Sequence, residues 1–178
     1  MSDKHRIDGS RIHLRSVRPA DATERYVSWL NDPEVNRYLE VRFSPQTLEG
    51  VRAYIDDMAK SADYVFLAIM LNDGARHIGN IKIGPINRAH LFADIGIVIG
   101  EKDCWGKGCA TEAIALATRY AFDSLGLHRL EAGAYAPNMG SAKAFLKAGW
   151  REEAREAAKW LVDGEFVDGI RVACVKGR

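Results

Sequence analysis

The chain has 178 residues, which fits one domain of ordinary size. Hydrophobic residues make up 47% and charged residues 28%, the balance of a globular protein with enough apolar side chains for a core. Lysine and arginine number 25 against 24 aspartates and glutamates, so no global field favours nucleic acid or an anionic membrane as a partner. We therefore expect a single domain over residues 1–178.

The three cysteines, Cys104, Cys109 and Cys174, do not form the pattern of a disulfide framework. The pair at 104 and 109 also lacks the tight spacing and the second cluster of a zinc site. We predict reduced thiols in a cytoplasmic protein without a bound metal. The polar N-terminus has no secretory h-region, and no run of about 18 apolar residues predicts a membrane span.

The first sixty residues predict one strand and two helices separated by turns. Apolar alternation indicates the strand, and apolar residues three and four apart indicate the second helix. Residues 1–10 are polar, and we expect them to be loosely held. The predicted elements are a strand over 12–17, a helix over 22–30 capped by Asp21, a short segment over 35–39 and a helix over 47–60.

From residue 64 the sequence alternates between strand and helix patterns. The predicted strands cover 64–71, 77–86, 92–99, 130–136, 157–162 and 166–175. Two helices are predicted, one that ends near residue 125 and one over 141–148. Three consecutive strands predict an antiparallel meander, and the later strand–helix–strand crossover predicts a parallel pair. We therefore predict an α/β (α+β) fold, with a mixed, mostly antiparallel sheet of about seven strands flanked by about four helices.

A glycine-rich loop lies between the predicted strand 92–99 and the helix that follows. The first amides of a helix have no intrahelical partner and the helix dipole adds positive charge, so phosphate binds well there. Gly106 and Gly108 permit close approach, Lys107 adds a cation and Thr111 offers a hydroxyl. The spacing is neither that of a Walker P-loop nor that of a dinucleotide fingerprint. The residues predict a pyrophosphate site over 105–110.

This loop belongs to a longer series of motifs. The series comprises Leu14-Arg15-Ser16-Val17-Arg18-Pro19-Ala20-Asp21, Asp94-Ile95-Gly96, Trp105-Gly106-Lys107-Gly108 with Ala110-Thr111-Glu112-Ala113, Leu127-His128-Arg129-Leu130-Glu131-Ala132, Asn138-x-x-Ser141 and Lys147-Ala148-Gly149-Trp150. In this order, over residues 10–175, the sequence resembles the GNAT superfamily of N-acetyltransferases. Within the superfamily it resembles the branch of ribosomal-protein alanine N-acetyltransferases. The resemblance implies acetyl-CoA as the cofactor.

The resemblance also implies where the cofactor binds. The strand before the loop would offer backbone groups to the thioester and the pantetheine arm. The implied cofactor-binding residues are Ile97, Val98, Ile99, Trp105, Gly106, Lys107, Gly108, Cys109, Ala110, Thr111, Asn138 and Ser141. The sequence departs from the family at two positions: Asp103 stands where glutamine or arginine is frequent, and Phe145 where many members have a tyrosine acid.

Acetyl transfer to an amine needs a route for the amine proton and a proton donor for the leaving thiolate. Asp94 is the first candidate for the base, and Glu101, at the other end of the same strand, is the second. For the acid, Ser141 or a water molecule could replace the missing tyrosine. Glu112, in the first turn of its helix, is expected to stabilise the helix dipole instead.

The acceptor site is implied by the resemblance alone, which places it among residues 29–32, 36–38 and 87–90 and the predicted hairpin 159–166. The candidate substrate-binding residues are Trp29, Asn31, Asp32, Tyr38, Asn87 and His90, of which the aromatic ones could equally pack in the core. We predict acetylation of a primary amine on a small molecule, such as an amino sugar or sugar nucleotide. The alternatives are a protein N-terminal amine, a non-catalytic acyl-CoA-binding module and nucleotide binding without acyl transfer. The sequence also leaves open whether the protein forms a homodimer.

Overall fold

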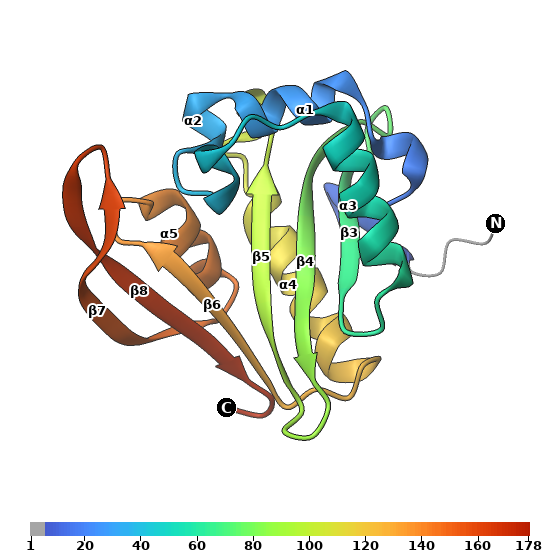
Figure 1. The fold of residues 1–178 in the computed structure, drawn as a ribbon. Coiled ribbons are helices and arrows are strands. Elements are labelled where there is room, and N and C mark those ends of the chain that lie inside the picture. The colour runs from blue at the N-terminus through green and yellow to red at the C-terminus, as the bar shows by residue number, and fades with distance from the viewer. Residues whose placement is uncertain (1–5) are drawn as a thin grey trace.

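The structure, a computed structural model, describes residues 6–178. They form one eight-stranded sheet in the order β1-β2-β3-β4-β5-β6-β8-β7 (Figure 1). The strands are β1 Arg6–Asp8, β2 Ile12–Ser16, β3 Val65–Leu71, β4 His77–Asn87, β5 Phe92–Ile99, β6 Arg129–Tyr135, β7 Arg151–Val162 and β8 Glu165–Val175. Only β5 and β6 are parallel; every other neighbouring pair is antiparallel. The predicted mixed, mostly antiparallel sheet is confirmed.

Five α-helices cover the sheet. They are α1 Glu24–Asn31, α2 Pro33–Asn36, α3 Leu48–Lys60, α4 Cys109–Asp123 and α5 Met139–Lys147. Helix α3 lies in front of the sheet and α4 behind it in Figure 1. Helix α4 forms the crossover between β5 and β6, which explains why this one pair is parallel. None of the helices within residues 6–178 is long and apolar enough to cross a membrane.

Two hydrophobic clusters hold these layers together, one on each face of the sheet. Between the sheet and the helices α4 and α5, the buried residues include Leu14, Ile69, Ile114, Leu130 and Phe145. Between the sheet and the helices α1 and α3, they include Tyr26, Trp29, Val51 and Ile55. Strand residues alternate between the faces, so the central strands are covered on both sides and buried. In β5, the strand that carries the site, only Ala93 and Ile95 are buried, both in the cluster beneath α4 and α5, and the residues of its other face are partly or fully exposed.

The predicted cap of the first helix was wrong. Thr23, not Asp21, is the N-cap of α1, and its hydroxyl accepts a hydrogen bond from the amide of Tyr26 at 3.2 Å. Asp21 instead receives two hydrogen bonds of 2.7 Å from the guanidinium of Arg15. A buried carboxylate needs such a charged partner, and this tertiary requirement decides the position of Asp21.

The two ends of the sheet also differ from the prediction. Residues Arg6–Asp8, expected to be loosely held, form β1 and pair with β2, while residues 1–5 lie outside the described part of the chain. Strand β7 begins at Arg151, six residues earlier than predicted. The sequence of β7 lacks a clear alternation of apolar and polar residues, because two irregularities interrupt its register with β8 and most of its side chains are exposed.

Candidate active site

Strands β5 and β6 separate part-way along their length. They pair through Phe92–Arg129, Ala93–Leu130 and Asp94–Glu131 and then diverge, as Figure 1 shows. The remainder of β5 pairs with β4 alone, so its other backbone edge faces the space between the two strands. An edge with unpaired amides and carbonyls can bind an extended ligand that contains amide groups, through the same hydrogen bonds that an additional β-strand would make.

The register of β4 and β5 identifies the backbone groups on this edge. Ile99 is opposite Gly79, and the amide of Gly100 donates to the carbonyl of Ile78 at 2.8 Å. Because antiparallel ladders alternate, Ile97 and Ile99 direct their N–H and C=O groups away from β4. Val98, also predicted to bind cofactor, directs its backbone toward β4 and can contribute only its half-exposed side chain.

The glycine loop follows the end of β5 and has an open outer surface. Gly106 and Gly108 have φ angles of 72° and 84°, in the left-handed region that a side chain disfavours. A Cβ on Gly106 would meet no heavy atom within 4 Å, so the space beside the loop is free. The indole N–H of Trp105 donates to the Ile99 carbonyl at 2.8 Å and fastens the loop to β5.

The start of α4 completes a phosphate-binding geometry. Gly108 is the N-cap and provides no side chain to cap the helix. The amides of Cys109, Ala110 and Thr111 therefore have no intrahelical acceptor and lie at the positive end of the helix dipole. With the exposed Lys107 beside them, these residues fit the pyrophosphate of an acyl-CoA.

Asp103, the residue that departs from the family pattern, is paired within the structure. Its carboxylate accepts a hydrogen bond of 2.6 Å from Arg76, in the turn between β3 and β4. This hydrogen bond lowers the pKa of Asp103 and keeps its charge neutralised by the guanidinium. The loop thus has an arginine beside it, although that arginine comes from another part of the chain.

The predicted thiols are not reactive groups. Cys104 and Cys109 are buried on either side of the loop, and burial raises the pKa of both. A protonated, buried thiol is a packing group and not a nucleophile. Within residues 6–178, no cluster of histidine, cysteine and carboxylate side chains could hold a metal ion.

Helix α5 begins directly after β6 and brings two predicted residues to the site. Asn138 is its N-cap, and its side-chain oxygen accepts from the amide of Ser141 at 3.3 Å. No protein group among the described residues binds the Ser141 hydroxyl. Phe145 is only 2% exposed and packs against Trp150, with ring centroids 4.8 Å apart. The phenylalanine therefore fills the core and offers no proton.

Asp94 is the last residue of β5 that pairs with β6, and β5 and β6 separate beyond it. Its carboxylate is 3.9 Å from the guanidinium of Arg171, which also binds Glu131 at 3.1 Å. Burial raises the pKa of Asp94, Arg171 lowers it and Glu131 raises it, with a net increase. A carboxylate with a raised pKa is better suited to accept a proton at neutral pH.

Glu101, the second candidate for the base, has a different environment. Its carboxylate accepts hydrogen bonds from Arg25 at 2.7 Å, Trp29 at 2.8 Å and Arg76 at 3.4 Å. The hydrogen bond from Arg25 is the main cause of a lowered pKa, with further contributions from the other two donors. A carboxylate held in its charged form by three donors is a poor base. Glu101 therefore has a structural role, in which it joins these three side chains.

The predicted acceptor residues do not form one site. Trp29 is buried beneath Gly100, and Asn31 exchanges two hydrogen bonds with the backbone of Gln46. Asp32 caps α2 and binds Lys102 at 2.7 Å. Asn87 and His90 belong to the β4–β5 turn, at the opposite end of the sheet from the glycine loop. The side chain of Tyr38 alone lies beside the end of β6.

Around Tyr38 the structure reveals a cluster that the sequence did not indicate. We call it the Tyr135 cluster; it comprises Tyr38, Glu40, Arg42, Tyr135 and Trp160. The Tyr135 ring is 5.6 Å from Tyr38 and 4.9 Å from Trp160. Its hydroxyl donates to Glu40 and accepts from Arg42 at 3.0 Å. Burial, then the hydrogen bond to Glu40, raises the pKa of Tyr135, so the phenol keeps its proton.

The Tyr135 cluster connects two distant segments across the end of β6. Arg42 also donates to the Leu161 carbonyl at 3.4 Å, and Arg37 pairs with Asp163 at 2.6 Å. Residues 37–42 are thereby joined to the β7–β8 hairpin. The resemblance placed residues 36–38 and the hairpin 159–166 at the acceptor site, but nothing in the sequence indicated Glu40, Arg42 or Tyr135. Residues 40–43 have no strand or helix period, and Tyr135 resembles any aromatic strand residue.

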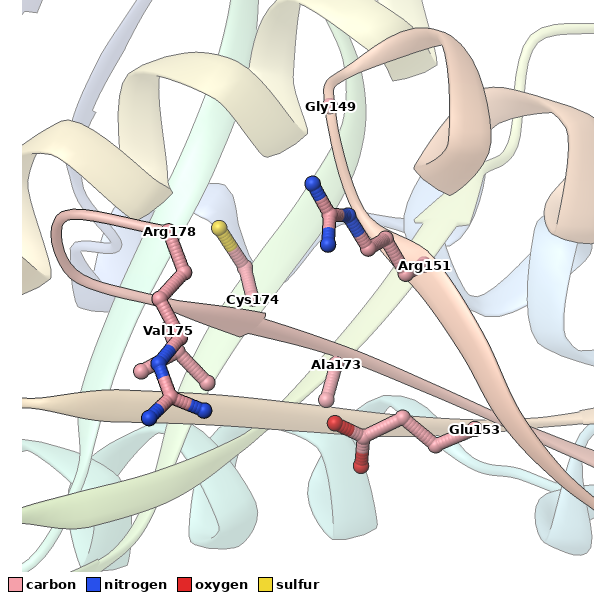
Figure 2. A pocket seen from close by; sticks show the side chains of 7 residues that line it. All are labelled: Gly149, Arg151, Glu153, Ala173, Cys174, Val175 and Arg178. Atoms are coloured by element: carbon pink, nitrogen blue, oxygen red, sulfur yellow. The ribbon is translucent and has the colours of Figure 1, made fainter.

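A cavity of about 120 Å³ lies elsewhere, between the start of β7 and the end of β8. Figure 2 shows Arg151, Glu153, Cys174 and Arg178 among the residues that line it. None of the predicted site residues belongs to it, and its volume is far below that of a CoA-sized ligand. The separated strands, and not this cavity, are therefore the candidate active site.

Comparison with known proteins identifies the family. The model of the "Acetyltransferase (GNAT) domain" matches residues 11–151. The chain belongs to the GNAT acetyltransferase family. The probable N-acetyltransferase YjcK of Bacillus subtilis is 32% identical to this GNAT chain over 173 residues, covering 91% of the chain and 92% of the relative.

Solved GNAT structures share the fold. Spermidine N-acetyltransferase from Vibrio cholerae, in complex with CoA and spermine, has a TM-score of 0.83 at 20% identity, covering 94% of this chain and 97% of that one. Mycobacterium smegmatis RimJ, in complex with CoA-disulfide, has a TM-score of 0.83 at 22% identity, covering 97% and 88%. The predictions of a GNAT N-acetyltransferase and of acetyl-CoA as the acetyl donor are confirmed.

Proposed function

We propose that this N-acetyltransferase acetylates the primary amine of a small molecule and that Asp94 accepts the amine proton. The observation that carries the proposal is the connection of residues 37–42 to the β7–β8 hairpin across the end of β6. A segment tied down at both Arg37 and Arg42 limits the room beside β6. A small acceptor needs less of this room than a protein N-terminus on its folded domain.

Acetyl-CoA supplies the acetyl thioester, and the residues of the chain act around it. Ile97 and Ile99 offer the amides that can hold the pantetheine arm and polarise the thioester carbonyl. Asp94 lies on the same face of β5 as the exposed Gly96, where a missing side chain leaves room for an acceptor. The carboxylate is positioned to receive the proton that the amine loses during attack, directly or through one water.

Three alternatives for the proton donor follow from the site. Ser141, the hydroxyl proposed from the sequence, lies in the first turn of α5, beside β6. The buried phenol of Tyr135 lies at the end of β6 and keeps its proton at neutral pH. Water is the third. We propose Ser141 first, because its hydroxyl has no partner within residues 6–178, while that of Tyr135 already donates to Glu40.

Among small amines, the Vibrio cholerae structure with CoA and spermine supports an aliphatic polyamine as one candidate class. Amino-sugar nucleotides form the class that the sequence suggested. The protein N-terminal amine is the second function and rests on the sequence resemblance to the ribosomal-protein branch. These classes differ in size and charge, so a direct comparison separates them.

The test is the rate of CoA release with three acceptors at equal concentration: spermidine, an amino-sugar nucleotide and a short alanyl peptide with a free N-terminus. We expect kcat/KM for at least one small amine to exceed that of the peptide by about 100-fold, or ~2.7 kcal/mol of transition-state stabilisation. A peptide preferred over both small amines would refute the proposal. In the variant Arg37→Gln the turnover of the peptide should increase, because the tie at Arg37 is lost while the one at Arg42 remains.

A further inference from the structure

The turn between β1 and β2 is fixed against the first turn of α4. The carboxylate of Glu112 accepts hydrogen bonds from the Ser10 hydroxyl at 3.0 Å and from the Arg11 amide at 3.1 Å. A Cβ on Gly9 would lie 2.5 Å from a Glu112 oxygen, so this close approach needs glycine. Burial would raise the pKa of Glu112, but the donors of Ser10 and Arg11 outweigh it and keep the carboxylate charged.

This attachment places the Arg11 side chain beside the glycine loop. A Cβ on Gly108 would lie 4.0 Å from Nη1 of Arg11, an atom that comes from a distant part of the chain. Among the described residues the guanidinium is otherwise held by a contact of 3.4 Å to Glu112, and its side chain is 64% exposed. It can therefore move toward a ligand on the loop without breaking a strong interaction.

The charges around Arg11 indicate what that ligand is. Arg11 and Lys107 are both cations, and both lie at the end of α4 where the helix dipole is already positive. In the free protein these two positive charges repel each other, and the negative charge of Glu112 balances only one of the two cations. An anion bound between them would relieve the repulsion and receive hydrogen bonds from the free amides of α4.

We propose that Arg11 is a phosphate-binding residue of the acetyl-CoA site. It would supply a guanidinium from the β1–β2 turn, whereas the guanidinium of Arg76 beside the loop is paired with Asp103, the residue at the family's Gln or Arg position. Arginine suits this role because its planar fork donates two hydrogen bonds to one phosphate. Glu112 acts as a positioning residue that holds the turn. The inference concerns donor binding and does not depend on the identity of the acceptor.

Calorimetric titration with CoA, without any acceptor, tests the assignment. The variant Arg11→Gln should bind CoA about tenfold more weakly, the size expected for the loss of one charge-assisted hydrogen bond. Arg11→Lys should recover part of the affinity, because the charge remains while the fork is lost. Repeating the titration with 3′-dephospho-CoA locates the contact: a loss that persists assigns Arg11 to the diphosphate, and one that disappears assigns it to the 3′-phosphate.

Arg6→Gln is the matched control, because Arg6 lies on the same hairpin and binds the exposed Asp8 at 2.9 Å. Its affinity for CoA should equal that of the unaltered protein. The Arg11 backbone makes its own contacts, to Glu112 and from the Asn72 amide at 2.9 Å, so thermal unfolding should change little. Unchanged affinity of a folded Arg11→Gln variant for both CoA and its dephospho form would overturn the assignment. Weak turnover with every acceptor would leave this result unaffected.

Discussion

Replacing Gly106 by alanine tests the phosphate site, because the structure separates two effects of the change. At φ 72°, a residue with a Cβ costs ~1–2 kcal/mol, part of which is offset by the lower entropy of the unfolded chain. The Cβ meets no atom within 4 Å, so there is no steric clash in the free protein. We therefore expect Gly106→Ala to lower the melting temperature by about 2–4 °C, typical of ~1 kcal/mol in a domain of this size.

The effect on the ligand should be larger. A methyl group on the open side of the loop would occupy the space in which a phosphate approaches the amides of α4. The loss of one or two charge-assisted hydrogen bonds, at ~1.5–3 kcal/mol each, predicts a fall in acetyl-CoA affinity of about 10-fold to 100-fold or more. Calorimetry with acetyl-CoA and a thermal melt without ligand measure the two effects independently.

Gly126→Ala is the control for backbone strain. Gly126 has φ 68° and no atom within 4 Å of its Cβ, but it lies beyond the opposite end of α4. It should lose as much stability as Gly106→Ala and bind acetyl-CoA normally. If both variants bind acetyl-CoA with unchanged affinity, the pyrophosphate does not bind on the glycine loop and our reasoning about the site fails.

Two further changes test the proposed base and the buried ion pair. Asp94→Asn should lower kcat/KM about 100-fold at pH 7 and less than about tenfold near pH 10, where the amine is already neutral; a loss that is equal at every pH would exclude Asp94 as the base. Asp21→Asn should cost about 3 kcal/mol in urea unfolding at pH 7, because it leaves Arg15 uncompensated in a buried pair. Burial raises the pKa of Asp21, but the hydrogen bonds from Arg15 lower it by more, so the pKa in the folded protein is below its ordinary value. The stability that the ion pair contributes is therefore present above pH ~4 and is lost as the pH falls through the folded-state pKa. At pH 3 the unfolding midpoints of Asp21→Asn and the unaltered protein should therefore approach each other, and a constant difference would contradict the assignment.

The elements that the sequence predicted well are those whose signal is local. Helix α3 and the central strands have clear apolar periods, and Gly106 and Gly108 lack the Cβ that disfavours their left-handed backbone. The boundaries that failed depend on tertiary contacts and not on the local period of the sequence. Asp21 was predicted as a cap from its neighbours, but Arg15 binds it in the folded protein.

The same distinction applies to the candidate site. Its donor half lies in a continuous stretch of chain, from β5 through the loop to α4, so both the residue types and their order are visible in the sequence. The acceptor half is assembled from segments that are about one hundred residues apart, such as Glu40 and Tyr135, which a one-dimensional pattern does not connect. Trp29 and Glu101 illustrate the same limit, since each was a candidate site residue and the two form a structural hydrogen bond.

By itself the sequence determined the fold class and the family, and it predicted the location of the acetyl-CoA loop. These follow from local periods, from backbone angles that only glycine adopts easily and from a distinctive order of motifs. The tertiary structure decided that Arg11 from the β1–β2 turn and Arg76 from the next hairpin lie beside that loop, and it assembled the Tyr135 cluster at the end of β6. Side chains meet across a sheet according to its strand order and register, and both are set by packing of the whole chain.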